Sequence, residues 1–178
     1  MLRHGIQAMS FYAIVCLFGS DGHHHVCDPE PKYYAWKVLA NLENAYIKYT
    51  NYNETSRICM GVSAVTFKGC DVVPLFDFTF RAPGDSAIQT VPQYGKVGKH
   101  PDIIQFYDRD TGNLAAEYNV LYSNYTTCTV LRKTHSNQCR LRIKYDSSSA
   151  DINECLQKFY PLCGIRLYDL YNEELCPA

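Results

Sequence analysis

Residues 103–145 read IIQFYDRDTGNLAAEYNVLYSNYTTCTVLRKTHSNQCRLRIKY. Four runs in this stretch alternate apolar with polar side chains and are rich in Val, Ile, Leu, Tyr and Thr, a composition typical of β-strands. Turn-forming residues separate the runs, most clearly at 110–113 and 135–137. The stretch therefore predicts four antiparallel strands joined as hairpins, over residues 103–108, 114–123, 127–133 and 139–145.

The same alternation continues upstream of this stretch. It predicts four further strands, over residues 46–52, 58–67, 72–82 and 87–92. Turn residues at 68–69 and 82–85 fit hairpins between them. Eight mostly antiparallel strands in sequence favour an up-and-down barrel, because closure removes exposed edges and leaves room for one small ligand. The predicted fold is thus mainly β, and a two-sheet sandwich stays open as the alternative.

Two helices flank the predicted strands. Over residues 31–45 the apolar positions recur at steps of three and four, with Pro31 in the first turn: Tyr34, Val38, Leu39, Leu42 and Ala45. After the serines at 147–149, Asp151 is the expected N-cap of a second helix. Its apolar face consists of Ile152, Cys155, Leu156 and Phe159. We expect this C-terminal helix to pack against the outside of the barrel.

The N-terminal residues have the pattern of a secretory leader. Arg3 and His4 precede an apolar stretch at 11–18, and small residues follow at 19–22. The apolar stretch is too short for a bilayer core of about 30 Å. We therefore expect a signal peptide over residues 1–20 with cleavage between 19 and 22, a secreted product, a flexible segment over 21–30 and one domain over 31–178.

The chain has nine cysteines, and removal of the leader with Cys16 leaves eight. An even number without any C-x-x-C pair predicts disulfides rather than metal ligands or reactive thiols. The eight are Cys27, Cys59, Cys70, Cys128, Cys139, Cys155, Cys163 and Cys176. Acceptor sequons at Asn53 and Asn124 fall in predicted turns, so both are expected to be exposed and glycosylated.

Four short segments carry a resemblance to a known family: AWKVL at 35–39, ENAY at 43–46, ICMGV at 58–62 and ECLQKF at 154–159. In these positions the chain resembles the salivary lipocalins of ticks, the histamine-binding family. The resemblance implies a lipocalin barrel with disulfides Cys59–Cys176 and Cys128–Cys155. It leaves four cysteines, for which Cys139 with Cys163 and Cys27 with Cys70 is the pairing expected by elimination.

The chain departs from the amine-binding members of that family. Those members carry an acidic residue after the seventh-strand cysteine and a Glu-Leu-aromatic triplet on the eighth strand. Here Thr129 and the triplet Arg140-Leu141-Arg142 stand at those places. Histamine or serotonin would then need a relocated carboxylate, with three candidates: Asp77, Asp108 and Glu117. In these losses, its length and its two sequons, the chain is similar to the Japanin group, which acts on host dendritic cells.

The eighth strand allows two facings, and they imply different ligands. With Arg140 and Arg142 inward, the cavity would bind a carboxylate such as that of a fatty acid or eicosanoid. With Leu141, Ile143 and Tyr145 inward, it would be apolar and suit a sterol such as cholesterol. We favour the second facing, because unpaired buried guanidinium groups are rare. The candidate ligand-binding residues are Phe76, Phe78, Phe80, Tyr118, Val120, Tyr122, Arg140 and Arg142.

Composition and motifs exclude several other classes of function. The formal net charge of −1, without a basic stripe, argues against nucleic-acid or anionic-membrane partners. No nucleophile motif or phosphate loop occurs; Asp110-Thr111-Gly112 fits a hairpin turn, and the run His23–His25 fits a disordered terminus better than a metal site. We predict a non-enzymatic, cofactor-free monomer that binds a small hydrophobic ligand and modulates host immune cells, with a receptor on such a cell as a further partner. The alternatives are an amine scavenger and a module binding a host receptor or complement protein, with the barrel as scaffold.

Overall fold

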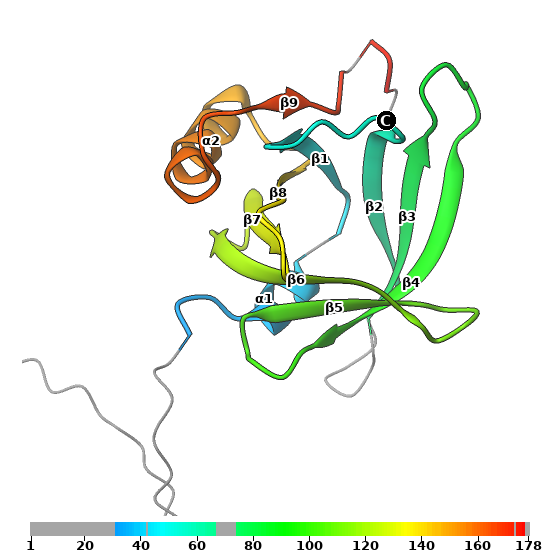
Figure 1. Ribbon diagram of the computed structural model, residues 1–178, viewed down its shortest axis with the longest axis vertical. Helices are drawn as coiled ribbons and strands as arrows, with labels where there is room; N and C mark the ends of the chain where they lie inside the picture. The colour runs from blue at the N-terminus through cyan, green and yellow to red at the C-terminus, as the bar shows by residue number, and fades with distance from the viewer. Residues whose placement is uncertain (1–30, 42, 67–73, 173, 177–178) are drawn as a thin grey trace, which may run out of the picture. The chain divides into compact units, whose positions relative to one another are not determined.

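Figure 1 shows the protein as a computed structural model that describes residues 31–41, 43–66, 74–172 and 174–176. Eight antiparallel strands form a closed barrel in the order β2-β3-β4-β5-β6-β7-β8-β1, and β1 pairs with β2 to complete it. Their bounds are β1 Ala45–Thr50, β2 Ile58–Thr66, β3 Leu75–Arg81, β4 Gln89–Val97, β5 Ile103–Asp108, β6 Leu114–Ser123, β7 Cys128–Lys133 and β8 Cys139–Lys144. The barrel prediction is confirmed and the sandwich alternative is eliminated.

Most strand bounds follow the sequence pattern, and β5 and β6 begin and end as predicted. The strand expected to end at Pro92 instead continues to Val97 as β4. Proline has no amide hydrogen to donate, but the Pro92 carbonyl accepts a hydrogen bond from the Arg109 amide at 3.1 Å. A two-residue strand, β9 at Tyr168–Asp169, pairs with β1 and was not predicted. The expected turn at 68–69 lies outside the described residues.

The first helix is shorter than predicted. α1 spans Ala35–Ala40 rather than residues 31–45, and Asn41 forms its C-cap. Asn44 then adopts a positive φ of 48°, and Ala45 begins β1. Ala45 is buried because it faces the barrel interior. Its apolar character therefore reflects a strand position, although its spacing from Leu42 also fits a helix.

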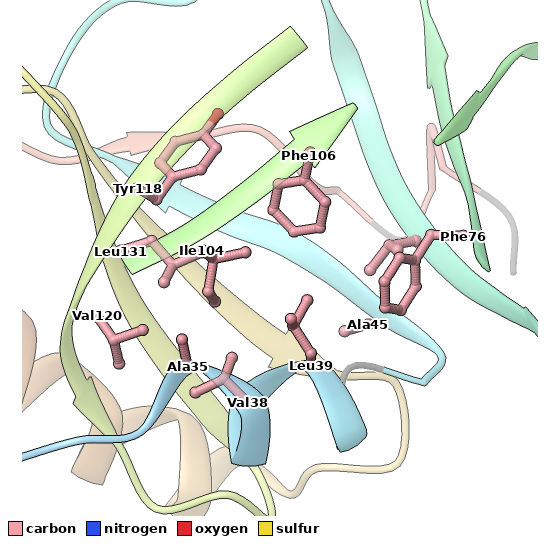
Figure 2. Packing of buried hydrophobic residues seen from close by; sticks show 11 residues of the cluster. Ala35, Val38, Leu39, Ala45, Phe76, Ile104, Phe106, Tyr118, Val120 and Leu131 are labelled. Carbon is pink, nitrogen blue, oxygen red and sulfur yellow. The ribbon is translucent and has the colours of Figure 1, made fainter. Parts of the chain in front are cut away.

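α1 packs across one end of the barrel (Figure 2). Its buried face points toward an aromatic and aliphatic cluster made by side chains from several strands. Ala35, Val38 and Leu39 supply that face, and the Ala35 amide donates to the Pro101 carbonyl at 2.7 Å. A Cβ atom at Gly95 of β4 would lie only 2.6 Å from Leu39 Cδ2. Glycine at this position therefore lets α1 approach the strand.

Gly95→Val tests that close approach. We expect it to lower the free energy of unfolding by about 1–3 kcal/mol, because the added methyls overpack a filled site beside Leu39 and Phe76. Urea denaturation measures the loss. In a double-mutant cycle with Leu39→Ala the two losses should be less than additive, since truncating Leu39 makes room for the valine. Strict additivity would contradict the proposed contact.

The second helix lies where it was expected, but it begins earlier. α2 spans Ser149–Cys163, and Ser148 rather than Asp151 is its N-cap. Asp151 occupies the third helical position and completes a capping box, in which its carboxylate accepts from the Ser148 amide at 2.9 Å. Cys155 and Phe159 are buried against the outer face of β7 and β8. The prediction of an outer C-terminal helix is thus confirmed.

Three disulfides join terminal segments to the barrel wall. They are Cys59–Cys176, Cys128–Cys155 and Cys139–Cys163. The first two are the pairs that the resemblance implied, and the third matches the pairing expected by elimination. Cys27 and Cys70 lie outside the described residues, so their pairing stays a prediction. Within the described part of the chain, no helix combines the length and the apolar character needed to cross a membrane.

Candidate ligand-binding cavity

The barrel contains a cavity of about 430 Å³, a volume in the usual range for small-molecule sites. Much of its wall is aromatic or aliphatic. The apolar side chains come from six strands and include Ile47, Met60, Val62, Phe78, Phe80, Val91 and Phe106. Such a wall suits the apolar part of an organic ligand.

Five of the eight residues proposed from the sequence line this cavity: Phe78, Phe80, Tyr118, Arg140 and Arg142. Phe76 and Val120 also point inward, but they belong to the buried core that packs against α1 (Figure 2). Tyr122 lies on the outer face, where its ring packs edge-on against Tyr33 with centroids 5.7 Å apart. The strand pairing shifts register between Val120 and Tyr122, which breaks the alternation used to predict its direction.

The preferred facing of β8 is wrong. Leu141 and Ile143 are buried in the outer cluster beneath α2, and Tyr145 packs against Tyr46 and Tyr171 outside the cavity. The two arginines therefore point inward. The physical reason is that α2 covers the outer face of β8, so apolar side chains on that face are buried without facing the barrel interior.

Arg142 is a buried cation for which the described residues supply no counter-charge in direct contact. The residue is 3% exposed, and its guanidinium lies 5.5 Å from the ring centre of Phe78 and 5.3 Å from that of Phe106. Among the described residues, Nε and Nη1 find no hydrogen-bond acceptor. Burial lowers the pKa of Arg142 to about 10, so the group stays protonated at neutral pH. The two rings attract the cation but do not neutralise it.

Arg140 is better satisfied. Its Nε donates to the Tyr52 hydroxyl at 2.8 Å, and its Nη2 lies 4.0 Å from Glu54 Oε2. The guanidinium also lies 5.6 Å from the ring centre of Tyr118. Burial acts to lower the pKa of Arg140, but Tyr118, Tyr52 and Glu54 outweigh burial and raise it. The two inward arginines therefore differ in the groups that surround their charges: Arg140 lies beside a carboxylate and a hydroxyl, and Arg142 lies beside aromatic rings.

Of the three carboxylates proposed to bind an amine, two lie outside the cavity lining. Asp77 pairs with Arg109 at 2.5 Å and Glu117 accepts from Gln105 at 2.6 Å, and neither lines the cavity. Asp108 does line it, but its Oδ1 accepts three hydrogen bonds from the Asp110 and Thr111 turn. These bonds lower the pKa of Asp108 and engage one of its two carboxylate oxygens.

The cavity is basic overall. Its charged lining consists of four cations and one carboxylate among the described residues: Arg57, Lys133, Arg140, Arg142 and Asp108. The described residues contain no cluster of His, Cys, Asp or Glu that could hold a metal ion. The arrangement can bind an organic anion by charge and an apolar group by contact with the wall.

The match to known proteins gives the family. Residues 30–177 match the family described as tick histamine binding protein. The chain belongs to this family. A solved structure described as the AM182 serotonin complex matches with a TM-score of 0.59 and 19% identity, over 85% of this chain and 97% of that one. A cockroach allergen, Per a 4, matches with a TM-score of 0.50 and 13% identity, over 74% and 87%. No curated protein sequence matches.

Family membership indicates a ligand-binding protein with a lipocalin-like barrel, and the low identities to the solved structures support the fold alone. Two residues at or beside the cavity were not predicted from the sequence, Phe106 and Glu54. Phe106 could have been found from the alternation of Ile104 and Phe106 in its strand, whereas no local signal marks Glu54 as a neighbour of Arg140.

The two sequons differ in their surroundings. Asn53 is exposed in the loop between β1 and β2. Asn124 is half-buried, and its side-chain Oδ1 accepts from the Thr126, Thr127 and Cys128 amides. Glycosylation of either residue stays a prediction.

Proposed function

We propose that this member of the tick histamine-binding family binds a small amphipathic carboxylate, such as a fatty acid or an eicosanoid, inside its barrel. The observation that carries the proposal is Arg142, a buried cation that faces the cavity and has no carboxylate partner among the residues that the structure describes. A buried charge is strongly unfavourable unless it is paired. A ligand carboxylate would supply the missing charge and accept hydrogen bonds in the planar geometry that guanidinium offers.

The apolar wall argues for a ligand with a hydrocarbon part. Phe78, Phe80 and Phe106 surround the site with aromatic faces, and Met60 adds a flexible side chain that adapts to different chain shapes. A sterol would also fit an apolar wall, but its neutral hydroxyl would leave the charge of Arg142 uncompensated. We therefore favour the acid over cholesterol among the hydrophobic ligands considered.

A biogenic amine is the second candidate, because the family is described as histamine binding and one structural neighbour is a serotonin complex. An ammonium ligand in this cavity would meet Arg140 and Arg142. Like charges at short range repel strongly when water is excluded. Among the described lining residues Asp108 is the one carboxylate, and its Oδ1 already accepts hydrogen bonds from its own turn. The amine is therefore the weaker candidate.

We further propose that the protein is secreted and acts by sequestering its ligand at a feeding site, with an effect on host immune cells such as dendritic cells. Family membership and three disulfides are consistent with secretion. The immune-cell target, a receptor as partner and the link to the Japanin group rest on the resemblance in the sequence.

The decisive experiment is a binding comparison on delipidated, disulfide-bonded protein. We expect the fluorescent polyene fatty acid cis-parinaric acid to bind with a Kd of about 1 μM or tighter, and its methyl ester about tenfold or more weakly. The ester is the matched control, because it keeps the chain and removes the charge. Calorimetry with cholesterol, histamine and serotonin completes the set. Tight amine binding without acid binding would overturn the proposal.

A further inference from the structure

The loop between β1 and β2 holds polar side chains against Arg140. Asn51 fixes the base of this loop, because its Nδ2 donates to the Asn137 and Cys163 carbonyls at 2.8 and 2.9 Å, and its Oδ1 accepts from the Cys139 amide at 2.8 Å. These partners lie in the turn before β8, at the first residue of β8 and at the last residue of α2, and a disulfide joins the last two. The position of the loop relative to Arg140 is thus set by several bonds.

Glu54 is held in this loop as an anion. Its Oε1 accepts from both the amide and the hydroxyl of Ser56, at 3.1 and 2.6 Å, and its side chain is 15% exposed. Burial acts to raise the pKa of Glu54, but the Ser56 hydrogen bonds and the charges of Arg140 and Arg57 together lower it. Oε2 is left free to face Nη2 of Arg140.

The two inward arginines therefore have different needs. Arg140 has an internal carboxylate and a tyrosine hydroxyl, whereas Arg142 faces the rings of Phe78 and Phe106 and has no carboxylate partner among the described residues. Because they are two residues apart on one strand, both point to the same side, about 7 Å apart along the strand. A ligand head group with two neighbouring carboxylates would reach both of them.

We propose that Glu54 is a specificity-determining residue, an internal counter-anion for Arg140 that limits the ligand head group to a single carboxylate. This inference rests on the proposed function, because it specifies which acids the same cavity accepts. A second ligand carboxylate would have to displace Glu54 from Arg140 or lie beside it. Either arrangement is unfavourable, since like charges at short range repel strongly in a site that is largely buried.

Two acids with the same alkyl chain test the inference. Tetradecanoate and dodecylsuccinate differ by one carboxymethyl group, so their affinities report the effect of the second carboxylate. We expect the wild-type protein to prefer tetradecanoate. In Glu54→Gln, which keeps the Asn53 sequon, dodecylsuccinate should bind about tenfold more tightly, while tetradecanoate changes by less than about threefold. Isothermal titration calorimetry measures both affinities.

Glu154→Gln is the matched control, because Glu154 is exposed on α2 and the substitution makes the same change in net charge. It should leave the ratio of the two affinities unchanged. If Glu54→Gln unfolds, Glu54→Asp keeps the charge but withdraws it by one methylene, and it should shift the ratio in the same direction by a smaller factor. Near-UV circular dichroism checks the fold of each variant.

The outcomes separate this inference from the proposed function. If the wild-type protein binds tetradecanoate but Glu54→Gln leaves the ratio unchanged, or Glu154→Gln shifts it equally, the role of Glu54 is wrong and acid binding stands. If the wild-type protein binds neither acid, the proposed function itself is wrong.

Discussion

Arg142→Met should abolish tight binding of a fatty-acid carboxylate and, at the same time, stabilise the unliganded protein. The loss follows from removal of the charge-assisted hydrogen bonds that the proposed ligand makes, and should reach about 10- to 100-fold in affinity. The gain in stability follows because methionine fills similar space without a buried, uncompensated charge. We expect the free energy of unfolding to rise by about 1–3 kcal/mol.

Displacement of cis-parinaric acid and urea denaturation of the delipidated protein measure these two effects. Arg166→Met is the control, because Arg166 is exposed, and it should change neither quantity beyond about 0.5 kcal/mol. Saturating fatty acid should stabilise the wild-type protein by about 2.7 kcal/mol at a hundred times Kd, and the variant much less. An Arg142→Met protein that binds the acid like the wild type would refute the anchoring role of this residue.

Loss of the Cys59–Cys176 disulfide should be the most destabilising change considered. β1 and β2 are paired only at Ala45 with Val62 and Tyr46 with Gly61. Beyond these pairs the C-terminal segment lies between the strands: the Leu170 amide donates to the Lys48 carbonyl, and the Cys59 amide donates to the Leu170 carbonyl, both at 2.9 Å. Leu170 also packs against Ile47 and Met60, which line the cavity. The C-terminal segment thus completes the barrel wall.

The double variant Cys59→Ser with Cys176→Ser should lower the free energy of unfolding by about 2–5 kcal/mol, because the bond closes a loop with a sequence separation of 117. It should also weaken ligand binding, since the freed segment no longer fills the seam beside the cavity. The control is Cys128→Ser with Cys155→Ser, whose separation is 27 and which joins β7 to α2, away from that seam. Urea denaturation measures the free energy of unfolding of each variant, and titration with the fatty acid measures its affinity. Equal effects of the two double variants on ligand affinity would contradict a special role for the seam.

The cavity residues show where local pattern stops being informative. Period-two alternation divides a strand into two faces, but it identifies the inward face only when the other face meets water. In β8 both faces are buried, because Leu141 and Ile143 lie under α2 while Arg142 lies in the barrel. Hydrophobicity then fails to distinguish inside from outside, and the apolar side chains were assigned to the wrong face.

Alternating strands, turn residues and an amphipathic C-terminal segment were sufficient to predict the barrel, its strand order and an outer helix, because each is encoded by neighbouring residues. The direction of Arg142, the outward position of Tyr122 and the approach of Glu54 to Arg140 were decided by packing between distant segments. Residues 54 and 140 are distant in the sequence and meet because β1 pairs with β8. The tertiary structure therefore decides the charge of the cavity, because packing between distant segments determines which charged side chains are buried inside the barrel.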